Sequence, residues 1–223
     1  MADSTISSLP GTTRLSSRFE DLRPDLHAIA RLIQRGEKVL DLGCGDGALI
    51  RYLQEHRQVV ARGIELLESH VLACVRQGIS VRQGNLQEGL RDYPSGSFDS
   101  VILSQTIPYL NDPCFIIKEM LRVGSRAIVT VPNWGHWRCR LSLLLTGKAP
   151  QAPGLSQPWD AAPRARPLTI RDFEEFCNRQ GFEKAGAVYL QGGHTIPDRF
   201  DRDLRATTAV FVLKPSYGKG SMA

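Results

Sequence analysis

The chain has 223 residues, 42% hydrophobic and 23% charged, with a net charge of +5 and a pI near 9.1. A chain of this size buries about 70% of its unfolded surface, so it needs no disulfide or metal to fold. The composition excludes collagen, coiled coil and wholesale disorder. No apolar run approaches about 18 residues, so we expect no membrane span and no membrane partner.

The cysteines and the chain ends indicate the compartment. The five cysteines are odd in number and widely spaced, at Cys44, Cys74, Cys114, Cys139 and Cys177. This spacing excludes a zinc motif and fits a reducing compartment. The chain starts without the apolar segment of a secretory signal. We therefore expect a cytoplasmic protein without a metal site. Residues 1–18 are predicted to be a disordered tail and residues 214–223 a loose tail.

Helices and strands alternate over the domain expected at residues 19–213. In chain order the pattern predicts a helix over 24–33, a strand over 38–42, a helix after the glycine run 43–47, a strand over 59–65, a helix over 69–77, strands over 79–82 and 98–104, a helix over 111–122, a strand over 126–131, a helix over 169–180, and strands over 187–190 and 207–213. This alternation predicts a mostly parallel sheet. The proline-rich stretch 146–168 lacks any period and is predicted to be a lid or a partner-binding arm.

The most informative segment is VLDLGCGDG, residues 39–47, between a predicted strand and a predicted helix. Parallel sheets bind ligands at this position, and three glycines let the backbone approach a ligand closely: Gly43, Gly45 and Gly47. A P-loop is excluded, because no Gly-Lys-Ser/Thr follows. The looser dinucleotide fingerprint Gly43-x-Gly45-x-x-Ala48 is present, but the carboxylates of Asp41 and Asp46 would repel a pyrophosphate. They suit S-adenosylmethionine, which carries an ammonium and a sulfonium. The alternative for Asp46 is a helix cap.

Three further strand ends carry polar side chains. Glu65 follows Gly47 by 18 residues, the distance at which an acid commonly accepts from ribose hydroxyls. After the third strand, Asn85 and Leu86 could hold an adenine amino group and ring. Ser104 and Gln105 follow the fourth strand and face the same crevice. Four features in register with four strand ends predict a cofactor site.

Several segments resemble the MetW family of methionine biosynthesis proteins, within the class I S-adenosylmethionine-dependent methyltransferases: VLDLGCGDGALIRYL, QGNLQEGL, FDSVILSQTI, LTIRDFEEFC and, most distinctively, EMLRVGSRAIVTVPNWGHWRCRLSLLLTGKAP. The resemblance implies a doubly wound, Rossmann-like α/β fold with a mostly parallel, seven-stranded sheet and an antiparallel last strand. It implies that Asp41 and the three glycines hold S-adenosylmethionine or S-adenosylhomocysteine and that Glu65 holds the ribose. Asn85 stands where the superfamily often has Asp.

The resemblance also implies that the protein supports a separate homoserine O-acyltransferase. The residues after the fourth strand, Ser104 to Ile107, offer no strong base. Methyl transfer can proceed by proximity and orientation, so this does not exclude catalysis. We therefore expect a cofactor-binding protein that acts mainly through contact with a homoserine O-acyltransferase. The alternative is an active methyltransferase on a small molecule. RNA methylation is disfavoured, because no RNA-binding module accompanies the fold.

The segment after the fifth strand is both basic and aromatic. Because Trp and Arg are frequent at interfaces, we predict a partner or substrate surface at Trp134, His136, Trp137, Arg138 and Arg140, continued by the apolar residues 141–145. His136 is a candidate general base or a packing residue. Asp112-Pro113-Cys114 superficially resembles a Pro-Cys nucleophile, but Asp followed by Pro is typical of a helix start. No catalytic residue is assigned.

Overall fold

The computed structural model describes residues 22–150 and 165–215. The predicted N-terminal tail, residues 216–223 of the predicted C-terminal tail and most of the predicted arm lie outside these residues. Lys214, where the C-terminal tail was predicted to begin, instead ends the last strand. The strands are β1 (Lys38–Leu42), β2 (Val60–Glu65), β3 (Val81–Gln83), β4 (Phe98–Leu103), β5 (Gly124–Pro132), β6 (Glu183–Gln191), β7 (His194–Ile196) and β8 (Thr208–Lys214). The helices are α1 (Pro24–Leu32), α2 (Ala48–Arg57), α3 (Glu68–Arg76), α4 (Pro113–Val123), α5 (Trp137–Thr146), α6 (Ile170–Gln180) and α7 (Arg202–Arg205), with single 3₁₀ turns η2 (Leu86–Glu88) and η3 (Ile107–Tyr109).

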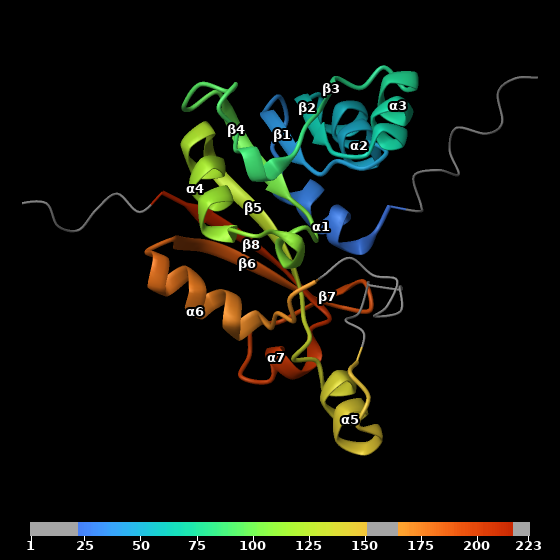
Figure 1. Cartoon of the computed structure of the whole chain (residues 1–223), viewed down its shortest axis with the longest axis vertical. Helices are drawn as coiled ribbons and strands as arrows, with labels where there is room; N and C mark the ends of the chain where they lie inside the picture. The colour runs from blue at the N-terminus through green and yellow to red at the C-terminus, as the bar shows by residue number, and fades with distance from the viewer. Residues whose placement is uncertain (1–21, 151–164, 216–223) are drawn as a thin grey trace, which may run out of the picture.

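All eight strands form one sheet in the order β3-β2-β1-β4-β5-β8-β6-β7, between layers of helices (Figure 1). The pairs among β1 to β5 are parallel. β8 runs antiparallel to both β5 and β6. The doubly wound fold and its antiparallel last strand are therefore confirmed.

The sheet has eight strands rather than the seven expected. The additional strand, β7, has three residues and pairs antiparallel with β6 across the turn Gly192–Gly193. Both glycines have positive φ, 54° and 90°, which suits a tight hairpin. A three-residue strand is too short to show a two-residue period, so the sequence pattern does not predict β7. The pattern does not predict the helices α5 and α7 either.

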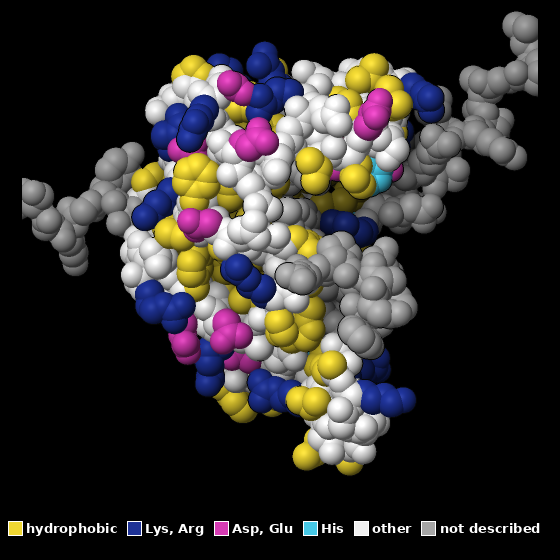
Figure 2. Space-filling model, in the orientation of Figure 1, with side chains coloured by type: hydrophobic (Ala, Val, Ile, Leu, Met, Phe, Trp, Pro, Cys, Tyr) yellow, Lys and Arg dark blue, Asp and Glu magenta, His cyan; other side chains and the backbone are white. Residues whose placement is uncertain are grey.

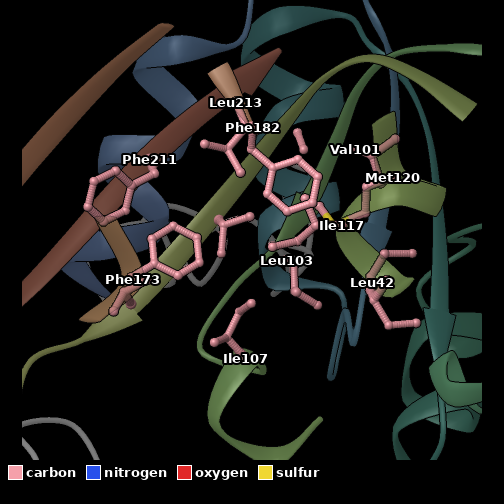
Figure 3. Packing of buried hydrophobic residues seen from close by; sticks show 14 of the residues in the cluster. Leu42, Val101, Leu103, Ile107, Ile117, Met120, Phe173, Phe182, Phe211 and Leu213 are labelled. Atoms are coloured by element: carbon pink, nitrogen blue, oxygen red, sulfur yellow. The ribbon is translucent and has the colours of Figure 1, made fainter. Parts of the chain in front are cut away.

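Side chains alternate between two hydrophobic cores, one on each face of the sheet. Val39 and Ile102 pack with α1 and α2, whereas their neighbours Leu40 and Leu103 pack with α4 and α6. On the second face, the rings of Phe173 and Phe211 lie 4.9 Å apart (Figure 3). Burial of both faces explains why the central strands read as continuous apolar runs.

Two predicted helix starts are formed by side-chain caps. The Asp112 carboxylate accepts a hydrogen bond from the Phe115 amide at 2.9 Å, and Pro113 occupies the first turn of α4. Thr169 and Asp172 form a reciprocal capping box at the start of α6. The Cys114 thiol lies 3.1 Å from the Gln180 side-chain oxygen. The Asp-Pro-Cys sequence therefore starts a helix, as its local pattern indicates.

Candidate functional site

The predicted site residues meet at the carboxyl edge of the parallel strands. Leu42 of β1 pairs with Ile64 of β2 and with Leu103 of β4, so Gly43, Glu65 and Ser104 follow at the same level. The sheet order reverses between β1 and β4, because β2 and β3 continue on one side and β5 on the other. In open α/β sheets this switch point is where ligands bind.

The glycine loop after β1 is a compact turn. Gly43, Gly45 and Gly47 all have positive φ, at 73°, 57° and 82°. The amides of Gly43 and Cys44 donate to the carbonyl of Ile64 at 2.8 and 3.2 Å. A Cβ on Gly47 would lie 2.4 Å from a side-chain carbon of Ile79, whereas a Cβ on Gly45 would meet nothing within 4 Å. Gly45 therefore borders open space, whereas Gly47 packs against Cys74 of α3 and against Ile79, which lies between α3 and β3.

A cavity of about 280 Å³ opens at the glycine loop. It brings together four predicted site residues from the ends of β1 and β4: Asp41, Gly43, Gly45 and Ser104. Asp46 also lines it, and its carboxylate accepts from the Ala48 amide at 3.2 Å. The N-cap position of α2 is taken by Gly47, so Asp46 forms a turn just before the helix and is not its cap. Gly47, Glu65, Asn85, Leu86 and Gln105 are not among its lining residues.

Asp41 is a buried carboxylate without a hydrogen-bond partner in the described part of the chain. Its exposed fraction is 3%, and it faces the cavity. Burial raises the pKa of Asp41 to about 7; the Arg23 guanidinium opposes this rise and the Glu65 carboxylate adds to it. Buried carboxylates are normally paired or hydrogen-bonded. The cavity therefore has an acceptor suited to a cationic ligand group.

Arg23 is a site residue that the sequence did not reveal. It precedes α1, and its guanidinium donates two hydrogen bonds to Asp25, at 3.1 and 3.2 Å, and one to Ser104 Oγ at 2.9 Å. The Ser104 hydroxyl in turn donates to Asp25 at 2.9 Å. Arg23 lines the same cavity as Asp41. The cavity thus presents the Asp41 carboxylate of β1 and the Arg23 guanidinium, which Asp25 of α1 and Ser104 after β4 hold in place. No local pattern marks Arg23, because Ser104 lies 81 residues away.

Glu65 is almost wholly engaged by backbone amides. One carboxylate oxygen accepts from the amides of Leu66 and Leu67, each at 2.9 Å. The other accepts from the Gly45 amide at 2.8 Å. Glu65 therefore adjoins the cavity through the glycine loop, and its second oxygen retains a lone pair for a ligand hydroxyl.

Three other predicted cofactor residues follow β3 and β4. The Asn85 side-chain oxygen accepts from the Gln87 amide at 3.0 Å and caps η2. Leu86 is half-buried against the core. Gln105 has a φ of 53°, a left-handed conformation that is uncommon outside glycine. Such backbone conformations cluster at functional sites, and Gln105 directly follows the strand end that carries Ser104.

The predicted basic-aromatic surface is only partly exposed. His136 has an exposed fraction of 4%. Its Nδ1 accepts a hydrogen bond from the Arg138 amide at 3.3 Å, so His136 caps the start of α5. Burial, reinforced by the Arg138 charge, lowers the pKa of His136. Trp134 is half-buried, whereas Trp137, Arg138 and Arg140 are exposed. His136 therefore starts a helix and does not line the cavity.

Asn133, a second residue that the sequence did not reveal, joins three segments where β5 ends. Its side-chain nitrogen donates to the carbonyls of Asp203 and Ala206 at 2.9 and 2.8 Å. Its oxygen accepts from the amides of Gly135 and Ile170 at 2.9 and 3.4 Å. The side chain is fully buried, so these bonds satisfy groups that water does not reach. Asn133 thus fixes the base of α5 to α6 and α7.

Comparisons with known proteins agree with this geometry. Residues 23–213 match the model of the family described as "Methionine biosynthesis protein MetW". The bifunctional methionine biosynthesis protein MetXA/MetW of Rhodopirellula baltica is 32% identical over 207 residues, which are 86% of this chain and 33% of that protein. The chloroplastic 2-methyl-6-phytyl-1,4-hydroquinone methyltransferase 1 of rice is 33% identical over 109 residues, covering 47% of this chain and 32% of the enzyme. The chain spans about a third of the length of these relatives.

The crystal structure of an S-adenosylmethionine-dependent methyltransferase from Mesorhizobium loti superposes with a TM-score of 0.65 at 17% identity. The match covers 88% of this chain and all of that one, and it shows the fold. Within residues 22–150 and 165–215, no helix has the length and hydropathy to cross a membrane. The family match extends over nearly all of the described residues, so the chain belongs to the MetW family of methionine biosynthesis proteins.

Proposed function

We propose that the protein binds S-adenosylmethionine or S-adenosylhomocysteine at the glycine loop and supports homoserine O-acylation by a partner homoserine O-acyltransferase. The observation that carries the cofactor assignment is the buried Asp41 carboxylate, which has no hydrogen-bond partner in the described residues and faces the cavity. An ammonium group would satisfy it, because a charge-assisted hydrogen bond compensates a buried carboxylate.

The lining of the cavity fits the amino-acid end of this cofactor. Its ammonium would be held by Asp41 and its carboxylate by Arg23, which Asp25 and Ser104 orient. Gly45 borders open space and lets the cofactor approach the backbone. Glu65 would accept from a ribose hydroxyl with its remaining lone pair. Asn85 and Leu86 would contact the adenine, with Gln105 beside it.

The residues after β4 orient the site without supplying a base. The Ser104 hydroxyl is bonded to Asp25, and the Thr106 hydroxyl donates to the Ser104 carbonyl at 2.9 Å. When bound, S-adenosylmethionine would supply an electrophilic methyl group. The protein's own contribution is to bind and orient the cofactor, which favours a sensing or supporting role over a reaction that requires proton abstraction.

The proposed partner is supported by the family and by one relative. The Rhodopirellula protein combines the names MetXA and MetW in one chain, of which this chain matches 33%. Two activities that are joined in one chain often act together. The chain is therefore proposed to act as the MetW component beside the acyltransferase.

The test is an acyltransferase assay with purified components from the same genome. We expect homoserine O-acylation to rise when this chain is added and the rise to depend on Asp41. Equal rates with and without the chain would refute the supporting role. Calorimetry with S-adenosylhomocysteine tests the cofactor separately, and absence of heat at millimolar ligand would refute it.

A small-molecule methyltransferase is the second candidate. The rice relative is named as a methyltransferase of a hydroquinone, and the matched structure from Mesorhizobium loti is a methyltransferase. The discriminating measurement is release of S-adenosylhomocysteine from S-adenosylmethionine in the presence of a panel of acceptors. Turnover that does not involve the acyltransferase would favour this candidate.

A further inference from the structure

The helix α5 stands apart from the two helical layers that cover the sheet (Figure 1). It carries four exposed leucines, of which Leu144 and Leu145 have exposed fractions of 81% and 71%. Leu141, Leu144 and Leu145 are spaced at i, i+3 and i+4, so they share one side of the helix. Clustered exposed apolar side chains mark interaction sites, whereas single ones do not.

A helix of this length needs packing to be stable. Ten residues are too few for an isolated helix in water, and α5 is supported at its first turn, by its cap and by the buried Cys139. His136 caps it, and Arg140 donates to the Gly135 carbonyl at 2.7 Å. Leu144 and Leu145, near its end, are mostly exposed and so bury little apolar surface against the described residues. This indicates that another surface covers them.

The charges on α5 identify the chemistry of that surface. Arg138 and Arg140 lie in the first turn, where the helix dipole favours acidic side chains, and the first turn contains none. No Asp or Glu occurs between Met120 and Pro150, whereas Lys148 adds a further cation just after the helix. Figure 2 shows basic and hydrophobic side chains beside one another over this helix. Carboxylates on a partner would satisfy both the arginines and the helix N-terminus.

The same charges argue against a second copy of this chain as the partner. Two copies of α5 in contact would bring Arg138, Arg140 and Lys148 of both helices together without a carboxylate from this segment. Like charges in contact oppose association. A different protein with an acidic rim around an apolar groove is the complementary partner.

We propose that α5 is the docking helix for the homoserine O-acyltransferase, with Leu141, Leu144 and Leu145 in an apolar groove and Arg138 against acidic residues at its rim. This inference rests on the proposed function, and it assigns the contact to one helix and one side of it. It also narrows the surface predicted from the sequence. His136 is buried and caps the helix, Trp134 is half-buried, and Trp137, Arg138 and Arg140 begin the contact.

The experiment is calorimetric binding of the full chain to the purified acyltransferase. The double variant Leu144→Gln/Leu145→Gln removes the apolar contact and keeps helix propensity, since Leu and Gln rank alike. We expect at least a tenfold loss of affinity with unchanged thermal unfolding. Leu72→Gln on α3, which is also an exposed leucine, is the matched control and should bind as the wild type does.

The charge is tested by Arg138→Glu, with Arg138→Lys as its conservative counterpart. The Arg138 side chain stacks on the Trp137 ring, 5.4 Å from its centre, and holds no other element in the described residues. We expect about a tenfold loss of affinity for Arg138→Glu, near-wild-type affinity for Arg138→Lys, and weaker binding of the wild type at high salt.

The outcomes are distinguishable. If the wild type binds and the double leucine variant binds equally well, α5 is not the docking helix, although the proposed function stands. If the wild-type chain does not bind the acyltransferase at all, both the proposed function and this inference fail. If the wild type forms a dimer that the leucine variant abolishes while acyltransferase binding persists, α5 is covered by a second copy and the inference is wrong.

Discussion

The Glu65 carboxylate accepts a hydrogen bond from the Gly45 amide at 2.8 Å, so the acid at the end of β2 holds the glycine loop that follows β1. This bond joins the ends of β1 and β2 at the loop that lines the cavity. Glu65 also accepts from Leu66 and Leu67, so three backbone donors surround a single buried carboxylate. Substitutions at this site can separate the structural role of Glu65 from its proposed role in ligand binding.

Replacing Glu65 by Gln should weaken both the fold and the cofactor site. An amide nitrogen would face a backbone N–H and leave it unpaired, which costs about 1–3 kcal/mol of unfolding free energy. We expect S-adenosylhomocysteine affinity to fall at least tenfold as well. Urea unfolding and calorimetry measure the two effects. Glu68→Gln, on the exposed start of α3, is the control. If Glu65→Gln kept full affinity for S-adenosylhomocysteine, Glu65 would not be a ribose ligand.

Gly45 and Gly47 should respond differently to Ala. Both have positive φ, which costs roughly 1–2 kcal/mol for a residue with a Cβ. At Gly47 the new carbon would also lie 2.4 Å from Ile79 and 3.0 Å from the Cys74 sulfur, and overpacking adds about 1–3 kcal/mol. At Gly45 it meets only open space, so Gly45→Ala should lose cofactor affinity with a smaller loss of stability. Equal stability losses in the two variants would contradict this packing difference.

Asp41 should make stability and cofactor binding depend oppositely on pH. Burial raises its pKa in the fold from 3.8 to about 7, so the folded state binds the proton more tightly. The resulting stabilisation is fully present below pH 3.8 and is lost as the pH rises through 7. Asp41→Asn should therefore be more stable than the wild type at pH 8, with the difference shrinking towards pH 4. Thermal unfolding at several pH values measures this.

The cofactor should bind better when Asp41 is ionised, because its ammonium requires the carboxylate. With a pKa about 7, the ionised fraction changes about tenfold between pH 6 and pH 8. We expect the affinity for S-adenosylhomocysteine to rise by up to this factor, and the rise to be absent in Asp41→Asn. A flat wild-type profile over this range would exclude Asp41 as the ammonium ligand.

Arg23 should distinguish ligands that carry a carboxylate from those that do not. Arg23→Ala is expected to weaken S-adenosylhomocysteine at least tenfold and to leave 5′-methylthioadenosine, which lacks the amino-acid end, unchanged. Arg35→Ala is the matched control, because Arg35 bonds to Gln58 on the surface. Equal losses of affinity for both ligands would show that Arg23 supports the fold of the site and does not bind the ligand carboxylate.

The sequence predicted the central elements well because they are locally encoded. Val39 and Leu40 face opposite cores, as do Ile102 and Leu103, so each of these strands stands in the sequence as a continuous apolar run. The place of Asp41 and Gly45 beside the cavity was predictable, because in parallel sheets the loop after the first strand borders the ligand-binding edge. The residues that escaped prediction depend on partners distant in the chain. Arg23 bonds to Ser104 across 81 residues, and Asn133 bonds to Ala206 across 73.

The helix α5 escaped prediction for a different reason. Helical segments are recognised when apolar positions face a core and polar positions face solvent. The leucines of α5 face solvent, and Leu143 lies outside the stripe formed by the other three, so no clear period appears. The feature that hides the helix in the sequence is the same one that marks it as an interaction surface.

The four hydrogen bonds of Asn133 have a consequence for the thermodynamics of association. They fix the base of α5 to α6 and α7, so the helix holds its direction in the isolated chain. A partner therefore meets an ordered helix and does not have to fold one, and less conformational entropy is lost on binding. Calorimetry should accordingly show a heat-capacity change that matches the buried apolar area alone, without the larger change that accompanies coupled folding.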